Sequence, residues 1–206
     1  MNVAKNEFVA PLGSSTIGRL LFGRGAHNLT IRPDAPAGQL YRAHFEGNVP
    51  DVRTQDGTVR IDYPRTWHPL DWREHYADVA LNAGVPWAVE VRGGASDIKA
   101  DLGGLRLDSF GIGGGANHVQ LVLSEPFGTV TIRVEGGINN LGVRRPTGVA
   151  ARLSVEGGAN KLVLDGQRLG AVGGATTLES GNYPEASDRY EITIAGGAND
   201  VSVIAT

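Results

Sequence analysis

The sequence of 206 residues contains no cysteine. This absence excludes a disulfide framework, a zinc site built on thiolates and a cysteine nucleophile. No stretch approaches the roughly 18 consecutive apolar residues that indicate a transmembrane helix. The first seven residues also lack the basic stretch and apolar stretch of a signal peptide. We therefore expect a cytoplasmic protein with no membrane segment, which a partner would tether if it acts near a membrane.

The sequence also lacks a large excess of either basic or acidic residues. The chain has 19 basic and 22 acidic residues and a formal net charge of −3. This balance gives no electrostatic reason to bind nucleic acid or an anionic membrane surface, so neither is an expected partner. Hydrophobic residues make up 41% of the chain, which is enough for a packed core and too many for a disordered protein.

The most informative feature is an internal repeat built on glycine, which accounts for 30 residues, about twice the usual share. A glycine pair, a small or aliphatic residue and a polar residue recur at Gly93–Ser96, Gly114–Asn117, Gly136–Asn139, Gly157–Asn160 and Gly196–Asn199. The first four copies are spaced by 21, 22 and 21 residues. The last interval is 39 residues, close to two periods, and contains a degenerate copy at Gly173–Thr176. Such a period is typical of a solenoid, whose repeats stack and bury a shared core.

Each glycine pair lies between two stretches in which apolar and polar residues alternate. Around the last pair, Ile192 and Ile194 precede it and Val201 and Val203 follow it, with a polar residue inside each set. A period of two with β-branched residues predicts half-buried strands, so each unit is predicted to be strand, glycine corner, strand and turn. We therefore predict an all-β fold: a single-domain, right-handed parallel β-solenoid of about seven to eight coils with ~21 residues per coil.

The repeat divides this single predicted domain, residues 1–206, into two parts. Residues 76–206 carry the regular glycine-pair coils. Residues 1–75 carry degenerate coils, and an irregular segment occupies 63–76.

Glycine and asparagine have distinct predicted roles at the corner. Glycine allows a positive φ or a close approach to the next coil. Asparagine at equivalent positions of successive coils is predicted to form a ladder of amide hydrogen bonds. The alternative is a ligand-binding row, and either interpretation concerns Asn117, Asn139, Asn160 and Asn199.

The segment Val85–Asp97, followed by Ala100–Leu102, resembles the bacterial toastrack-type β-solenoid domains. These include the C-terminal domain of cell-wall-active-antibiotic response proteins and related candidate adhesin families. Leu81–Asn82 and Leu169–Gly174 share the resemblance, which covers residues 75–203 well and 15–75 loosely. The resemblance implies the solenoid fold and supplies no catalytic residues. It also implies a non-catalytic scaffold or protein-interaction module linked to the bacterial cell envelope or stress response.

No motif for catalysis or metal binding emerges from the repeat. The acids are spread over different outward rows and do not form the paired carboxylates of a glycosidase. Glu135 and Glu156 occupy equivalent places in coils predicted to be adjacent, and we interpret them as solvated acids balanced by arginine rather than as a weak cation site. We expect no enzyme activity, no cofactor and no metal. A carbohydrate-binding or carbohydrate-active β-helix is the alternative function.

The irregular segment is the candidate interaction surface. It holds two of the three tryptophans, and aromatic residues mixed with arginine are typical of interface hot spots. A short helix near 69–76 is possible, and a lid over the solenoid flank is the alternative role. The residues of this candidate surface are Trp67, His68, Trp72, Arg73 and Tyr76.

The ends of a solenoid expose unpaired backbone groups, so they must be capped or paired. The last predicted coil ends the chain without a polar cap, whereas the first 15 residues are long enough to fold over the other end. We therefore predict that Val201 and Val203 form an assembly edge for self-association, with a capped monomer as the alternative. A protein partner or a second copy is the expected binding partner.

Overall fold

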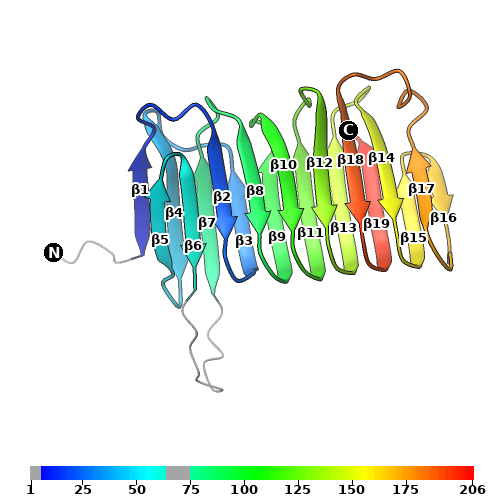
Figure 1. Cartoon of the computed structure of the whole chain (residues 1–206), viewed down its shortest axis with the longest axis horizontal. Helices are drawn as coiled ribbons and strands as arrows, with labels where there is room; N and C mark the ends of the chain where they lie inside the picture. Colours follow the sequence, from blue (N-terminus) through cyan, green and yellow to red (C-terminus); the bar gives the residue numbers. More distant parts are fainter. Residues whose placement is uncertain (1–5, 64–74) are drawn as a thin grey trace, which may run out of the picture.

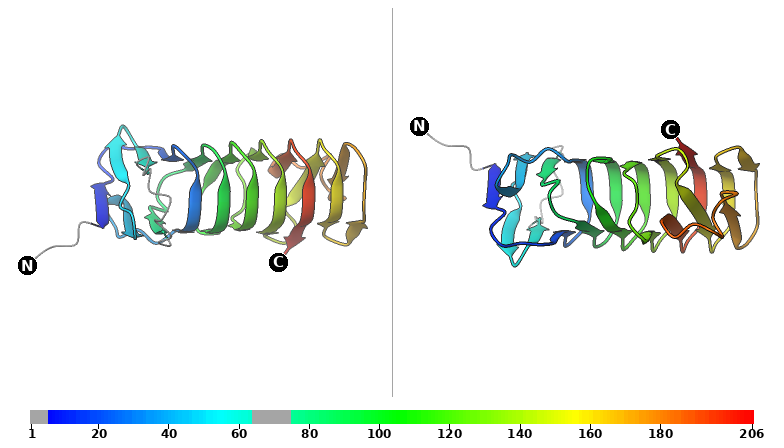
Figure 2. Two further views of the ribbon diagram at one scale, coloured as in Figure 1. Left: turned by 90° about the horizontal axis from the view of Figure 1, so that it is seen from below. Right: turned by 90° about the horizontal axis from the view of Figure 1, so that it is seen from above.

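The computed structural model describes residues 6–63 and 75–206 and contains only strands and turns in these ranges. The strands form two sheets that face each other along the length of the molecule (Figures 1 and 2). This confirms the predicted all-β class. In the described part of the chain, no helix is long and apolar enough to span a membrane.

The first sheet, here called sheet A, has ten strands. In spatial order they are β1 (Glu7–Pro11), β4 (Gln39–Glu46), β7 (Tyr76–Leu81), β3 (Ala26–Arg32), β9 (Ala95–Leu102), β11 (Ala116–Leu123), β13 (Ile138–Arg145), β19 (Ala198–Ala205), β15 (Ala159–Leu164) and β16 (Gln167–Leu169). The second, sheet B, has nine strands. From the end that faces β16, they are β17 (Thr176–Glu179), β14 (Ala150–Val155), β18 (Arg189–Ile194), β12 (Thr129–Val134), β10 (Leu107–Ile112), β8 (Trp87–Val91), β2 (Gly18–Phe22), β6 (Thr58–Asp62) and β5 (Asp51–Gln55).

The repeating unit is one strand of sheet B, a glycine corner and one strand of sheet A, as predicted. In the unit β8–β9, for example, Gly93–Gly94 separates the two strands. Successive units pair in parallel, so that Ala116 lies opposite Ala95 and Ile138 lies opposite Ala116. The arrangement is that of a β-solenoid, and its predicted right-handed sense stays a prediction.

Alternate residues of both sheets point inward and form one continuous hydrophobic core. The largest fully buried side chains include Trp87, Phe22 and Phe110. The indole N–H of Trp87 donates to the carbonyl oxygen of Asn82 at 2.8 Å, which satisfies its buried polar atom. Trp87 therefore belongs to the core, as its strand phase indicates.

The glycine pairs are required mainly because the backbones of stacked corners approach closely. A Cβ added at Gly196 would lie 2.5 Å from the backbone nitrogen of Gly137 in the neighbouring coil. The residue after the asparagine takes the left-handed conformation instead, for example Asn140 with φ of 62°.

The coils are not stacked in chain order. Strand β19 lies between β13 and β15 and pairs in parallel with both, and β18 lies likewise between β12 and β14. Figure 1 shows the C-terminus within the array rather than at its end. The prediction of an assembly edge at Val201 and Val203 is therefore wrong, because their strand is hydrogen-bonded on both sides and both side chains are fully buried.

Antiparallel strands close both ends of the stack. At one end β16 pairs with β15 and β17 pairs with β14, so the degenerate repeat at 173–176 does not form a coil of its own. At the other end β1 pairs with β4, β4 with β7 and β5 with β6. Residues 7–11 thus cover this end of sheet A, in line with the expectation for the first 15 residues.

Candidate functional site

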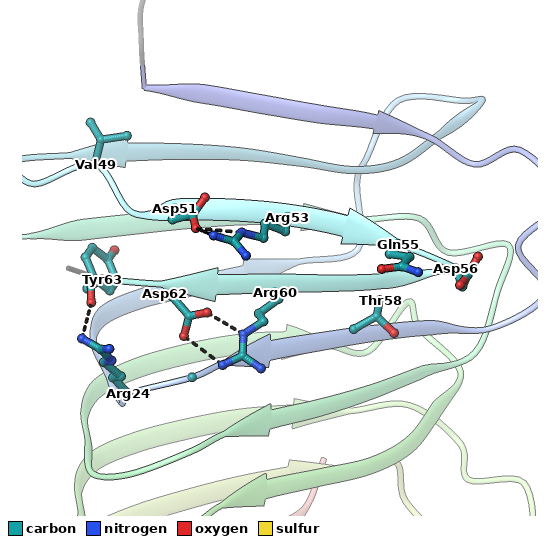
Figure 3. A pocket seen from close by; sticks show the side chains of 11 residues that line it. Arg24, Val49, Asp51, Arg53, Gln55, Asp56, Thr58, Arg60, Asp62 and Tyr63 are labelled. Carbon is teal, nitrogen blue, oxygen red and sulfur yellow. Dashed lines mark hydrogen bonds and ion pairs between the residues drawn. The ribbon is translucent and has the colours of Figure 1, made fainter.

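The outer face of β5 and β6, at the N-terminal end of sheet B, carries a concavity of about 1040 Å³. The side chains that point into it alternate along β5 and β6, as Figure 3 shows. The residues that set its chemistry are Asp51, Arg53, Thr58, Arg60, Asp62 and Tyr63.

The charges of this concavity are arranged in ion pairs. Arg53 contacts the carboxylate of Asp51 at 2.6 Å, and Nε of Arg60 donates to Oδ2 of Asp62 at 2.5 Å. The hydrogen bond from Arg60 is the main reason that the pKa of Asp62 lies below its usual value. The concavity therefore presents basic and acidic side chains side by side.

A second concavity of about 500 Å³ adjoins the first at Arg24 and Tyr63. Its floor is the glycine corner of successive coils, and the rings of Tyr63 and His75 line one side, with their centroids 6.1 Å apart. The backbone N–H of Asn48 donates to Nδ1 of His75 at 3.0 Å. Burial raises the pKa of Tyr63 to about 12, so its hydroxyl is neutral at physiological pH.

Serine, histidine and aspartate meet at the corner of the central coils, but their geometry does not form a catalytic triad. Oγ of Ser96 and the carboxylate of Asp97 both lie against Nδ1 of His27, the carboxylate at 3.7 Å. A triad needs the nucleophile and the acid on opposite ring nitrogens. Among residues 6–63 and 75–206, no group of three or more His, Cys, Asp or Glu side chains has a metal-binding arrangement.

The predicted asparagine ladder is present at the same corner. Asn139 donates to Asn117, Asn199 donates to Asn139 and Asn160 donates to Asn199, at 2.9, 2.6 and 2.9 Å. The ladder follows the spatial order of the coils and confirms the structural interpretation of these four residues.

Glu135 and Glu156 do not lie in adjacent coils, which corrects the sequence interpretation. The inserted coil β18–β19 separates their strands and contributes Ala195 at the equivalent position. Arg133 holds Glu135 at 2.6 Å and lowers the pKa of its carboxyl group.

The predicted interaction surface is only partly within the described residues. Tyr76 is the first residue of β7 and is 43% exposed. Tyr63 and His75, which also belong to the irregular segment 63–76, line the second concavity. Trp67, His68, Trp72 and Arg73, together with most of the possible helix near 69–76, lie outside the described residues.

Sequence reasoning missed the charged residues of β5 and β6. The available signal was the alternation of opposite charges in Asp51–Gln55 and Thr58–Asp62, which places the charges of each strand on one face.

Comparison with known proteins yields one family and one fold. The family model for the N-terminal domain of toast_rack, DUF2154, matches residues 22–144. A crystal structure of a candidate cell adhesion protein from Clostridium sporogenes superposes with a TM-score of 0.75 at 18% sequence identity, over 97% of this chain and 98% of that one. At this identity the likeness shows a shared fold. No curated protein sequence matches the chain significantly.

Proposed function

The chain belongs to the family of toast_rack N-terminal domains, and from this premise we propose that it is a non-catalytic protein-interaction module. We place its contact surface at the N-terminal end of the solenoid. The observation that carries this proposal is the large concavity on the edge strand β5 and its neighbour β6, where side chains of both charges face solvent. Exposed charges of both signs in a fixed arrangement select a partner with the complementary pattern.

The adhesion-related description of the Clostridium sporogenes protein is consistent with such a module. We extend it to this chain as a proposal: the domain acts in adhesion or assembly at the bacterial cell envelope. We also propose that it is cytoplasmic and reaches the envelope through its partner. Fractionation of cells that express a tagged chain tests the location.

The chemistry of the concavity favours binding over catalysis. A general acid at neutral pH needs a raised carboxyl pKa, whereas Arg60 lowers the pKa of Asp62. The carbohydrate alternative depends on a groove that combines acids with several aromatic rings, and Tyr63 is the aromatic residue that we find on this concavity.

The test compares two charge-reversal variants of equal net charge. Arg53→Glu with Arg60→Glu changes the concavity, and Arg144→Glu with Arg168→Glu changes exposed positions of sheet A far from it. Partners captured from bacterial extracts by the wild-type chain are identified, purified and titrated against all three proteins. We expect the first variant to weaken binding at least tenfold and the second to leave it within about twofold, since two charge-assisted contacts are removed only from the first.

Equal binding by both variants would contradict the assignment of the contact surface. A glycan array probed with the same proteins checks the alternative: a glycan bound by the wild-type chain and not by the concavity variant would favour carbohydrate binding instead.

A further inference from the structure

At the N-terminal end of the solenoid, one sheet extends further than the other, and we call this difference the step. Sheet A continues beyond the last parallel strand through β4 and β1, whereas sheet B continues only through β5. The hydroxyl of Tyr41 on β4 lies 3.1 Å from Oγ1 of Thr54 on β5, which shows that these two strands face each other. Strand β1 therefore extends one strand position further, and Figure 2 shows it as the outermost strand at this end.

At the opposite end no such step exists among the described strands. There, each sheet adds one antiparallel strand after its last parallel strand: β16 in sheet A and β17 in sheet B. The step at the N-terminal end is one strand wide, about 4.8 Å.

The core is incompletely covered beside this step. Phe8 on β1 and Val52 on β5 pack against the core but are only partly buried, as are Leu12 and Tyr63 at the same end. Phe8 meets Phe45 edge-on, with centroids 5.6 Å apart. In the centre of the solenoid the equivalent inward positions are almost fully buried, for example Val119 and Leu141. An additional strand beside β5 would bury the partly exposed apolar side chains.

Among the strands that the structure describes, none pairs with the outer edge of β5. Strand β5 pairs with β6 on one side and ends sheet B on the other, so alternate backbone N–H and C=O groups along it face away from the sheet. Its outward side chains are, in order, an acid, a base and an amide, namely Asp51, Arg53 and Gln55. Natural edges use such charges to prevent indiscriminate pairing, and a specific partner must therefore match them.

We propose that this step is an acceptor for a single extended β-strand of a partner protein, which pairs antiparallel with β5 and completes sheet B opposite β1. The strand has apolar residues at the positions that face Phe8 and Val52. Between them it carries an anionic residue beside Arg53 and a cationic residue beside Asp51. This inference rests on the proposed interaction function and names the binding mode at the same surface, namely strand addition to a sheet edge.

A second copy of the chain does not fit the step. A copy that paired through its own β5 would bring its β4 and β1 along, and the two sheets A would then compete for the same strand positions. An isolated strand has no second layer and meets no such obstacle.

The experiment tethers a test strand to the full-length chain, ahead of residue 1, through a flexible glycine–serine linker. The linker gives a millimolar effective concentration, so even a weak strand is tested. The matched strand is Thr-Val-Glu-Val-Lys, written to lie opposite Gln55 through Asp51 in antiparallel order. The control strand, Thr-Val-Lys-Val-Glu, has the same composition with the two charges exchanged. Amide hydrogen exchange of residues 51–55 is the readout.

We expect the matched strand to slow exchange in β5 at least tenfold and the control strand to slow it less than twofold. The variant Asp51→Lys with Arg53→Glu keeps the ion pair within β5 but inverts it, and it should reverse this preference. Equal slowing by both strands, or no slowing by either, overturns the strand acceptor. If the variant Arg53→Glu with Arg60→Glu still loses its partner in that case, the interaction function stands and only the binding mode is wrong.

Discussion

At the scale of single residues, each coil depends on one residue in the left-handed conformation directly after the corner asparagine or its equivalent. In spatial order these residues are Asn28, Asp97, His118, Asn140, Asp200 and Lys161, with φ between 49° and 62°. Asparagine, aspartate and histidine enter this region more readily than other side chains. The conformation that the corner requires thus selects the residue type in five of six coils, and Lys161 is the exception.

We therefore predict that Lys161→Asn stabilises the protein by roughly 0.5–1 kcal/mol, because asparagine relieves part of the cost of about 1–2 kcal/mol that a left-handed residue incurs. Urea-induced unfolding measures the change. The matched control is Lys99→Asn, an exposed position on β9 without a positive φ, which should be neutral or slightly destabilising. A loss of stability in Lys161→Asn would show that its lysine side chain contributes more than the backbone strain costs.

A second residue-scale prediction concerns alkaline pH. Tyr190 is fully buried and donates to the carbonyl oxygen of Ser124 at 2.9 Å. Burial raises its pKa to about 12, whereas an unfolded tyrosine titrates near 10. The native state therefore keeps a proton that the unfolded chain loses. The stability linked to this group is complete below about pH 10 and is lost as the pH rises toward about 12.

Urea titrations at a series of pH values check this dependence. Tyr190→Phe should be less stable than the wild type by about 1 kcal/mol at pH 7, because it lacks the hydrogen bond. Between about pH 10 and about pH 12 its stability should fall less steeply. Tyr41, Tyr63 and Tyr183, whose pKa values are also raised chiefly by burial, remain in both proteins and account for the residual slope. Parallel curves for the two proteins would exclude Tyr190 as a source of the pH dependence.

At the scale of elements, an ion pair between a buried arginine and a more exposed aspartate holds the C-terminal strand in place. Arg145, the last residue of β13, is 2% exposed and donates to Oδ2 of Asp165 at 2.5 Å, while its Nε has no hydrogen-bond partner. The other carboxylate oxygen of Asp165 accepts from the backbone N–H of Ala205 at 3.1 Å. One carboxylate thus links the end of β13 to the end of β19.

We predict that Asp165→Asn destabilises the protein by about 3 kcal/mol, because it leaves the guanidinium of Arg145 buried without a counter-charge. Asparagine suits the φ of 52° at this position and can still accept from Ala205, so the loss reports on the charge. Asp51→Asn, which breaks the exposed pair with Arg53, is the control and should cost less than about 1 kcal/mol. Similar losses in the two variants, measured by urea unfolding, would contradict a special role for the pair formed by the buried Arg145.

The same scale shows why the coil unit could be predicted from the sequence and the coil order could not. The alternation around each glycine pair determines strand, corner and strand, and the structure has these elements. The order depends on which coil packs on which. Leu141, Leu162 and Val201 occupy the same inward position and are all aliphatic, so the sequence pattern permits any of them as neighbours.

The candidate site was hidden for a related reason. The alternating charges at 51–55 and 58–62 are visible in the sequence, but an outward charged face is ordinary on any strand. These residues matter because β5 ends sheet B while β1 extends sheet A, and that difference arises only from long-range pairing. The interaction surface around Trp67, which the aromatic composition of its segment indicated, remains a prediction.

At the scale of the whole molecule, the solenoid combines nearest-neighbour packing with a chain path that crosses over itself. Each coil contacts chiefly the two beside it, as expected for repeat proteins, whose ends open more easily than their centres. Chain termini usually fray as well. In this protein the end of the chain and the end of the stack do not coincide. The C-terminal strand β19 lies inside the array, and strand β5, from the first third of the chain, lies at its edge.

We predict from this separation that amide exchange follows spatial position rather than sequence position. Amides in β19 should be among the slowest, together with those of β13, and amides in β5 and β16 should exchange fastest. Hydrogen-exchange mass spectrometry on peptides that cover 51–55, 167–169 and 198–205 measures this, with the unfolded chain as the reference for intrinsic rates. Fast exchange of β19 would mean that the inserted coil opens as a separate unit. Such opening would leave β13 and β15 without the strand between them. The amides of β13 and β15 that face β19 would then have to exchange as fast as those of β19.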